Sequence, residues 1–214
     1  MQIIKIDKDV MKKNKNYAKK NKQLLDQNDI FAIDVMGSVG SGKTSIIKQI
    51  VKKLKDKYRI GVIAGDLTTE IDAERIEEEN IPVIQVQTGR VCHLDAGLVG
   101  KAIKKFDLSN IDLLFIENVG NLICPAGCPI GVHSELVVTS VTEGPYMIKK
   151  HPPMFQKADT VAMNKIDLKE TMQVSLNDFK KDLWNLNPDA NFAGTNGITG
   201  EGVDDIIKCM NLQQ

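Results

Sequence analysis

The chain has 214 residues, 42 % of them hydrophobic, and its 28 basic residues balance 28 acidic ones. This length is enough to bury a full core, and balanced charge excludes a global field that attracts nucleic acid or anionic lipid. No run approaches the roughly 18 apolar residues that span a bilayer, and the first residues lack the apolar region of a signal peptide. We therefore expect a cytoplasmic protein with reduced cysteines and no nucleic-acid or membrane partner.

The chain opens on a lysine-rich segment. Residues 5–22 contain eight lysines, and Val10, Tyr17 and Leu24 recur every seven residues. This spacing predicts a helix with a narrow apolar stripe. We predict a solvated helix over residues 1–28, followed by one domain over residues 29–214. Docking of a partner or a membrane surface on the helix is the alternative.

Apolar runs and helical patterns then alternate. Strands are predicted at 31–36, 59–65, 81–88, 111–118, 135–141 and 159–165, and helices at 45–58, 71–80, 94–106, 175–186 and 201–211. This alternation predicts an α/β fold of three layers with a mostly parallel central sheet. Ligands bind such folds in the loops beyond the carboxyl ends of the strands.

The first of these loops carries a phosphate-binding motif. Residues 37–44 read GSVGSGKT and fit G-x4-G-K-[ST] between a strand and a helix, the pattern of a P-loop NTPase. Backbone N–H groups surround a phosphate, Lys43 neutralises the β and γ oxygens, and the Thr44 hydroxyl suits Mg²⁺. The expected nucleotide contacts here are Gly37, Ser38, Val39, Gly40, Ser41, Gly42, Lys43, Thr44 and Ser45.

A second motif indicates the base. Asn164, Lys165 and Asp167 form an N-K-x-D sequence that resembles the guanine-recognition motif of GTPases. A carboxylate at Asp167 accepts hydrogen bonds from guanine N1–H and N2–H₂, whereas adenine offers no such donor pair. We therefore predict GTP. Residues 196–202 resemble the last GTPase signature, although Asn196 and Ile198 replace its usual Ser and Lys.

Acidic residues follow two other strands. We expect Glu117, Asp66 and Asp72 to orient Mg²⁺ directly or through water, with Thr44, Asp72 and Glu117 as its ligands, and Gly120 to face the γ-phosphate. The alternative is that the acids are ordinary turn and helix-start residues. Hydrolysis should be slow, because no arginine finger or water-positioning glutamine is evident.

Three sulfur and nitrogen side chains also follow strands. Cys92 and His93 come after the strand at 81–88, and Cys124 after that at 111–118. Parallel strands end on one face, so these side chains can converge near the nucleotide. Thiolate and imidazole ligands suit Zn²⁺ or Ni²⁺. Ordinary packing is the alternative.

Longer segments carry a family resemblance. TGRVCHLDA, IDLLFIENVGNLICPA, VTEG, KHP and NKIDL together resemble the HypB-type hydrogenase nickel-incorporation GTPases over residues 28–210. The resemblance implies Cys92, His93 and Cys124 as nickel or zinc ligands. It also implies a homodimer of the SIMIBI class that forms around the nucleotides and is favoured by GTP or metal, and delivery of nickel to the hydrogenase large subunit.

The fourth metal ligand stays open: water, Cys128, a group from a second subunit, or His133. Residues 127–131 read GCPIG where the family has FDLG, and the cysteine cluster that some members use to store nickel is missing. A nickel-handling accessory protein is therefore expected to supply the ion. GTP and Mg²⁺ are expected to draw the 66–72 and 117–124 loops together and assemble the metal site, and hydrolysis to release it.

Three other functions compete with this prediction. An accessory GTPase for urease or cobalamin enzymes shares most of the nucleotide machinery. A P-loop small-molecule kinase with a structural zinc would have no use for the N-K-x-D motif. A metal-binding scaffold with negligible turnover would keep the nucleotide as a structural element.

Overall fold

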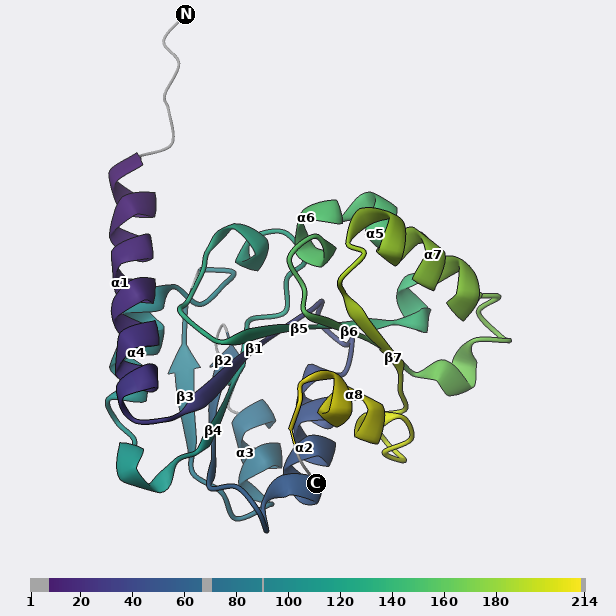
Figure 1. The fold of residues 1–214 in the computed structure, drawn as a ribbon. Helices are drawn as coiled ribbons and strands as arrows, with labels where there is room; N and C mark the ends of the chain where they lie inside the picture. Colours follow the sequence, from purple (N-terminus) through teal and green to yellow (C-terminus); the bar gives the residue numbers. More distant parts are fainter. Residues whose placement is uncertain (1–7, 67–70, 90, 213–214) are drawn as a thin grey trace, which may run out of the picture.

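The computed structural model describes residues 8–66, 71–89 and 91–212 (Figure 1). The first seven positions of the predicted N-terminal helix and positions 67–70 of the 66–72 loop lie outside the described residues. The described part is a three-layer α/β structure, and none of its helices is long and apolar enough to cross a membrane.

The described residues contain one seven-stranded sheet, in which every pairing is parallel. Its order is β3-β2-β4-β1-β5-β6-β7. The strands are β1 (Phe31–Met36), β2 (Ile60–Asp66), β3 (Val83–Gln87), β4 (Leu113–Glu117), β5 (Ser134–Ser140), β6 (Thr160–Asn164) and β7 (Asn191–Gly194). The central strands are apolar almost throughout because helices cover both faces of the sheet.

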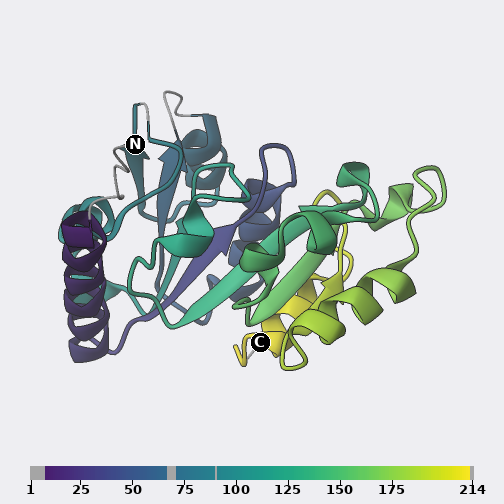
Figure 2. The same cartoon turned by 90° about the horizontal axis from the view of Figure 1, so that it is seen from above.

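Most of the helices connect successive strands. The helices are α1 (Lys8–Gln27), α2 (Lys43–Leu54), α3 (Ile71–Glu77), α4 (Ala96–Ile103), α5 (Met147–Lys150), α6 (Pro152–Phe155), α7 (Leu176–Leu186) and α8 (Val203–Cys209), with short 3₁₀ turns at Leu108–Asn110, Pro125–Gly127, Val141–Glu143 and Ile166–Leu168. Of these helices, α1 precedes β1 and α8 follows β7. Figures 1 and 2 show α2, α3 and α8 on one face of the sheet, and α1 and α4 on the other face, beside α5, α6 and α7.

The sheet side of α2 shows why the helix forms there. Ile46, Ile47, Ile50, Val51 and Leu54 are fully buried against the sheet, at the spacing of one helix face. Each such side chain contributes about 1.5–3 kcal/mol on burial. This packing fixes the start of α2, which follows the phosphate-binding motif directly.

The predicted N-terminal helix is present as α1, and its buried face coincides only in part with the predicted stripe. Tyr17 is exposed, whereas Ala18, Asn21 and Leu25 are buried. Asn21 donates to the carbonyls of Ala96 (2.7 Å) and Ile130 (2.9 Å). The stripe is therefore present only in part. Leu24 packs against the apolar core, Tyr17 does not, and a buried asparagine helps to hold α1 against the domain.

Six predicted strands and five predicted helices are present, each within a few residues of its predicted ends. The strand β7 was not predicted, because its four residues, Asn191–Gly194, include an asparagine and a glycine, both rare in strands. It forms by pairing with β6, from Thr160↔Asn191 onward. The sheet is also fully, rather than mostly, parallel.

A candidate nucleotide site beside a candidate metal centre

The loop between β1 and α2 depends on its glycines. Gly37 and Gly42 have φ of 150° and 97°, which residues with a Cβ rarely adopt. A Cβ on Gly37 would lie 2.1 Å from the Val138 carbonyl oxygen, and one on Gly42 would lie 2.1 Å from Asn164 Nδ2. The loop therefore closes tightly over the start of α2, where free N–H groups are available to an anion.

Lys43 reaches back into this loop. Its ammonium donates to the carbonyl oxygens of Gly37 (3.3 Å) and Ser38 (3.0 Å). Burial lowers the pKa of Lys43, and the Glu117 carboxylate opposes that shift. The acceptors are neutral carbonyls, so phosphate oxygens can replace them.

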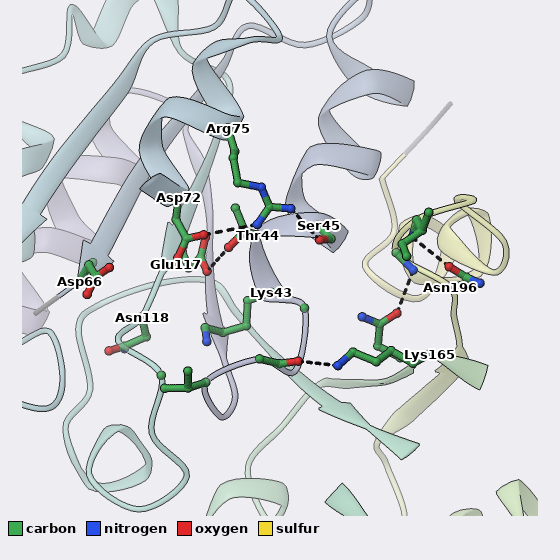
Figure 3. A pocket seen from close by; sticks show the side chains of 18 of the residues that line it. Lys43, Thr44, Ser45, Asp66, Asp72, Arg75, Glu117, Asn118, Lys165 and Asn196 are labelled. Atoms are coloured by element: carbon green, nitrogen blue, oxygen red, sulfur yellow. Dashed lines mark hydrogen bonds and ion pairs between the residues drawn. The ribbon is translucent and has the colours of Figure 1, made fainter. Parts of the chain in front are cut away.

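Thr44 and Glu117 form a buried polar pair. Thr44 Oγ1 donates to Glu117 Oε1 at 2.7 Å (Figure 3). Burial raises the pKa of Glu117 to about 7, although Lys43 acts in the opposite direction. Glu117 Oε2 is buried without a hydrogen-bond partner among the described residues. A hydroxyl and a carboxylate with an unpaired oxygen, close to Asp72, fit a Mg²⁺ ion, which prefers oxygen ligands.

The loop after β6 braces the phosphate-binding motif. Asn164 Nδ2 donates to the Ser41 carbonyl (2.9 Å), and Asn164 Oδ1 accepts from the Gly197 N–H (2.8 Å). Lys165 Nζ donates to the Gly40 carbonyl (2.8 Å). Asn164 thus joins the motif to the 196–202 loop.

The carboxylate of Asp167 is held by a side chain of the 196–202 loop. Asn196 Nδ2 donates to Asp167 Oδ1 at 3.0 Å, and Asn196 Oδ1 accepts from the N–H groups of Ile198 (2.9 Å) and Thr199 (3.2 Å). Asn196, which replaces the Ser of the usual GTPase signature, therefore orients the carboxylate expected to bind guanine. This role was not evident from the sequence.

These elements surround one cavity of about 410 Å³, within the range of small-molecule sites. Most predicted nucleotide and magnesium residues line it: Val39, Gly40, Gly42, Lys43, Thr44, Ser45, Asp66, Asp72, Glu117, Gly120, Asn164, Lys165 and Asp167. Three predicted contacts are not among its lining residues. Gly37 and Ser41 are buried in the loop, and the Ser38 hydroxyl donates to Glu143.

Arg75 also lines the cavity, although no arginine for the phosphates was predicted from the sequence. Its guanidinium donates to Ser45 Oγ (3.1 Å) and Asp72 Oδ1 (3.5 Å) (Figure 3). The available signal was the three-residue spacing of Asp72 and Arg75, which is also typical of an exposed helix surface.

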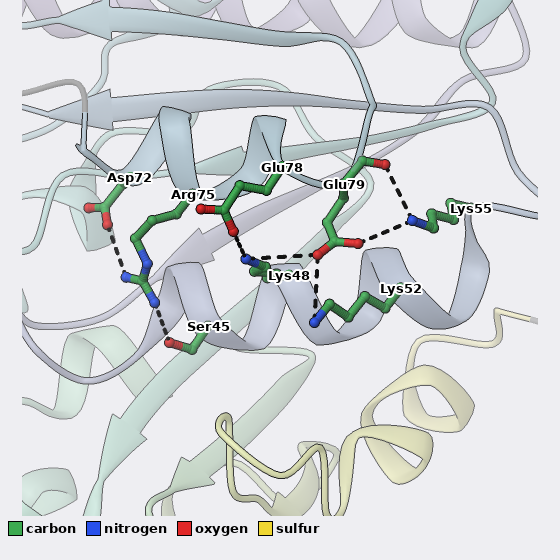
Figure 4. Close-up of polar contacts among 8 residues, drawn as sticks. All are labelled: Ser45, Lys48, Lys52, Lys55, Asp72, Arg75, Glu78 and Glu79. Atoms are coloured by element: carbon green, nitrogen blue, oxygen red, sulfur yellow. Dashed lines mark hydrogen bonds and ion pairs between the residues drawn. The ribbon is translucent and has the colours of Figure 1, made fainter.

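Ion pairs fix α3 to α2 (Figure 4). Glu79 is buried just beyond α3, and its carboxylate pairs with Lys48 (3.8 Å), Lys52 (3.6 Å) and Lys55 (3.1 Å) of α2 or its end. Lys48 also pairs with Glu78. The helix that carries Asp72 is therefore anchored to the helix that begins at the phosphate-binding motif.

The structure brings together the three predicted metal ligands. Among the described residues, Cys92, His93 and Cys124 form a group whose ligand atoms all lie within 4.8 Å of one another. The two Sγ atoms are 2.9 Å apart, and the Cys92 thiol raises the pKa of the Cys124 thiol. His93 Nδ1 is buried without a hydrogen-bond partner in the described part. This donor set fits Ni²⁺ or Zn²⁺.

Among the described residues, the other two candidate ligands are not members of this group of mutually close ligand atoms. Cys128 is half-buried, and burial, followed by the charges of Asp95 and Asp34, raises its pKa to about 11. His133 uses both ring nitrogens elsewhere: Nδ1 accepts from the Ala32 N–H (3.0 Å), and Nε2 lies 2.9 Å from Asp26. The suggestion of His133 as a ligand was wrong.

One loop joins the cavity to the metal group. The backbone N–H of Asn121 donates to the Gly37 carbonyl (3.0 Å), and its side-chain oxygen accepts from the Ile123 (2.7 Å) and Cys124 (3.3 Å) N–H groups. A Cβ on Gly120 would lie 2.9 Å from the backbone nitrogen of Val39. The loop therefore rests directly on the phosphate-binding motif.

Asn118 lies at the root of this loop and lines the cavity. Its Oδ1 accepts from the N–H groups of Leu94 and Val119, both at 3.0 Å, and its Nδ2 donates to the Asp34 carboxyl at 3.2 Å. Asp34 is fully enclosed, and burial raises its pKa to about 8. Neither residue was predicted from the sequence.

Comparisons with known proteins agree with this architecture. Residues 31–193 match the family model "CobW/HypB/UreG, nucleotide-binding domain". The chain is 45 % identical over 206 residues to a probable hydrogenase maturation factor HypB of Methanocaldococcus jannaschii, a match that covers 96 % of this chain and 93 % of that protein.

Solved structures extend the likeness to three dimensions. The HypB structure from Archaeoglobus fulgidus superimposes with a TM-score of 0.86 at 37 % identity, over 93 % of this chain and 97 % of that one. HypB from Helicobacter pylori in complex with nickel also gives 0.86, at 31 % identity, over 94 % and 98 % of the two chains. The chain thus belongs to the HypB hydrogenase maturation factors, within the CobW/HypB/UreG family of nucleotide-binding proteins.

Proposed function

We propose that this chain is a GTP-hydrolysing metallochaperone that binds Ni²⁺ or Zn²⁺ and helps to insert nickel into [NiFe] hydrogenase. The observation that carries the proposal is the 117–124 loop. It contributes Glu117 and Gly120 to the nucleotide cavity and Cys124 to the metal group. Family membership and the nickel complex of the Helicobacter pylori relative support it.

In this proposal the cavity residues hold GTP for slow attack by water. Lys43 exchanges its two carbonyl acceptors for oxygens of the β- and γ-phosphates and offsets their charge. Thr44, Asp72 and Glu117 would hold Mg²⁺, with Asp66 orienting its water shell. Bound Mg²⁺ would neutralise charge that develops on the phosphates. Asp167, oriented by Asn196, accepts from guanine.

In this proposal the bound nucleotide changes the metal affinity by changing the position of the loop that carries a metal ligand. Contacts of the γ-phosphate favour one arrangement of the 117–124 loop and of Asp66 and Asp72, and loss of that phosphate removes those contacts. A nucleotide can shift this equilibrium only by its different affinity for the two arrangements. Metal affinity should therefore differ between GTP-bound and GDP-bound protein.

A homodimer completes the proposal. Three ligands leave one position of a tetrahedral ion open, and the second subunit is one source for the fourth. Val39 and Ile123 are 83 % and 71 % exposed beside the two sites, and exposed apolar side chains on a functional face favour a protein partner. We propose that GTP or metal favours this dimer, that an accessory protein supplies nickel, and that the hydrogenase large subunit receives it.

The guanine assignment is tested with Asp167→Asn. Wild-type protein should release phosphate from GTP in preference to ATP, and the variant should lose this preference and accept xanthosine triphosphate. Retention of GTP preference by the variant would contradict the guanine assignment. Preferential ATP turnover with phosphoryl transfer to a small acceptor would support the kinase alternative instead.

Nickel delivery is tested by transfer. Nickel-loaded protein is mixed with a nickel-free hydrogenase large subunit, together with GTP, GDP or no nucleotide, and nickel in the large subunit is quantified after separation. Faster transfer with GTP than with GDP or no nucleotide supports the proposal. Equal transfer in all three mixtures would indicate a passive metal-binding scaffold.

A further inference from the structure

We propose that Asn118 and Asn121 are positioning residues that set the metal ligands according to the occupant of the nucleotide cavity, one asparagine for each arm of the metal group. This inference rests on the proposed function, because it explains how the two sites communicate. Both residues belong to the 117–124 loop, yet each holds a different ligand-bearing segment.

Asn118 serves the arm that carries Cys92 and His93. Its Oδ1 accepts from the Leu94 N–H at 3.0 Å, and Leu94 directly follows His93. Asn118 is 1 % exposed and lines the cavity beside Glu117 (Figure 3). A shift of its amide when the cavity fills must therefore be transmitted to the backbone next to His93.

Two backbone donors fix the orientation of that amide. The N–H groups of Leu94 and Val119 both need an acceptor, so the amide oxygen faces them, and Asn118 Nδ2 donates to Asp34 Oδ1 (3.2 Å) and Oδ2 (3.4 Å). Asp34 is part of β1, three residues before Gly37. The strand that leads into the phosphate-binding motif therefore contacts the side chain that holds the His93 arm.

Asn121 serves the arm that carries Cys124. Its backbone pairs with Gly37, the first residue of the motif, in an isolated antiparallel bridge. Its Oδ1 accepts from the Ile123 and Cys124 N–H groups. A movement of the phosphate-binding motif would thus be transmitted to Cys124 by Asn121 alone.

A purely structural role would stabilise the loop equally in every nucleotide state. A positioning role changes the ratio of two metal affinities instead. We define the coupling ratio as nickel affinity with a non-hydrolysable GTP analogue divided by nickel affinity with GDP. It is measured on the full chain by competition with a metal chelator, at nucleotide concentrations that saturate each variant.

Two variants break the tethers, and two matched variants keep them. Asn121→Ala removes the acceptor for Cys124, whereas Asn121→Asp retains a side-chain oxygen there. Asn118→Ala removes the acceptor for Leu94. The double variant Asp34→Asn with Asn118→Asp inverts donor and acceptor between the two positions, and the acceptor for Leu94 is kept.

We expect wild-type coupling of about 5- to 150-fold in either direction, the usual range for linked sites. Both alanine variants should bring the ratio to within about twofold of one, and Asn121→Asp and the inverted pair should restore most of it. If Asn118→Ala does not fold, as thermal unfolding will show, the half-buried Asn121 still provides the test.

The outcomes separate the two proposals. A wild-type ratio other than one that neither alanine variant changes overturns the role of the asparagines and leaves the proposed function standing. Their role is likewise overturned if Asn121→Asp and the inverted pair fail to restore coupling in folded protein. A wild-type ratio of one, or no nickel binding, overturns the coupling in the proposed function, and the role of the asparagines with it.

Discussion

The nucleotide cavity and the metal group share a loop but differ in how they are prepared. In the cavity the side chains are held by fixed partners: Lys43 by two carbonyls, Thr44 by Glu117, and Asp167 by Asn196. In the metal group the two thiols contact each other, and His93 Nδ1 has no hydrogen-bond partner in the described part. The positions of the cavity side chains are thus fixed by hydrogen bonds within the fold.

The arrangement of the metal group depends on the contacts that position the two loops carrying its ligands. Its three residues are only partly buried, so packing contributes little to their arrangement, and backbone tethers from Asn118 and Asn121 contribute more. The difference indicates that nucleotide binding should tolerate loss of the metal ligands, whereas metal binding should depend on the nucleotide loop. Variants in the nucleotide cavity and in the metal group test this asymmetry.

The largest effect is expected in the cavity. Lys43→Ala should lower GTP hydrolysis at least about 100-fold, because a preorganised charge on the phosphates is lost, while nickel binding to nucleotide-free protein changes little. Steady-state phosphate release and nickel titration measure the two effects. Lys53→Ala, on the same helix but paired with Asp204 at the surface, is the matched control and should hydrolyse GTP normally.

On the metal side, Cys124→Ala should reduce nickel affinity at least about 100-fold, beyond the 10–100-fold typical of losing an outer-shell partner. GDP affinity should stay within about twofold of wild type. Chelator competition and fluorescent-nucleotide titration check both expectations. Cys209→Ala, in the distant α8, should leave both affinities unchanged; an equal loss of nickel there would contradict the assigned ligands.

Asp34→Asn should stabilise the protein increasingly as pH rises. The pKa of Asp34 is raised from 3.8 to about 8 by burial, so the folded state retains a proton that the unfolded chain releases. That contribution is complete below about pH 4 and is lost as pH rises through about 8. Even one pK unit corresponds to about 1.4 kcal/mol, or about 3 °C in Tm at this chain length.

Thermal unfolding of wild type and Asp34→Asn at pH 5 and pH 9 provides the comparison. The Tm advantage of the variant should be larger at pH 9. An advantage of the same size at both pH values would show that the buried carboxyl does not carry this penalty.

The smallest effect concerns the anchor of α3. Glu79→Gln should lower stability by about 1 kcal/mol, because three lysines lose the carboxylate they share, and the loss should shrink in high salt. Denaturant unfolding at low and high salt measures it. Glu78→Gln, which affects an exposed carboxylate paired with Lys48, should cost less; an equal cost would argue against the shared pairing.

Local motifs and a parallel sheet were predictable from the sequence. Residues 37–44 and 164–167 carry their chemistry at fixed spacing, and parallel strands bring Cys92, His93 and Cys124 to one edge. Contacts that exist only after packing were not predictable. The sequence around Asn118 does not show that its side chain contacts both Asp34 and Leu94 in the folded chain. Arg75 lines the cavity from α3, which ion pairs anchor to α2.

Short or mixed elements were hard to predict for a related reason. The strand β7 has too little apolar pattern to be recognised, and it is specified by pairing with β6. The buried face of α1 includes Asn21, which is satisfied by carbonyls more than 70 positions away in the chain. Hydrophobic periodicity cannot report such long-range hydrogen bonds.

Nickel affinity measured with a GTP analogue and again with GDP, alongside the size of the protein in solution, tests the central proposal most directly. We expect the two affinities to differ at least about fivefold, with the tighter binding in the state that favours the dimer. Identical affinities and identical size with both nucleotides would contradict the proposal that the 117–124 loop links the cavity to the metal group.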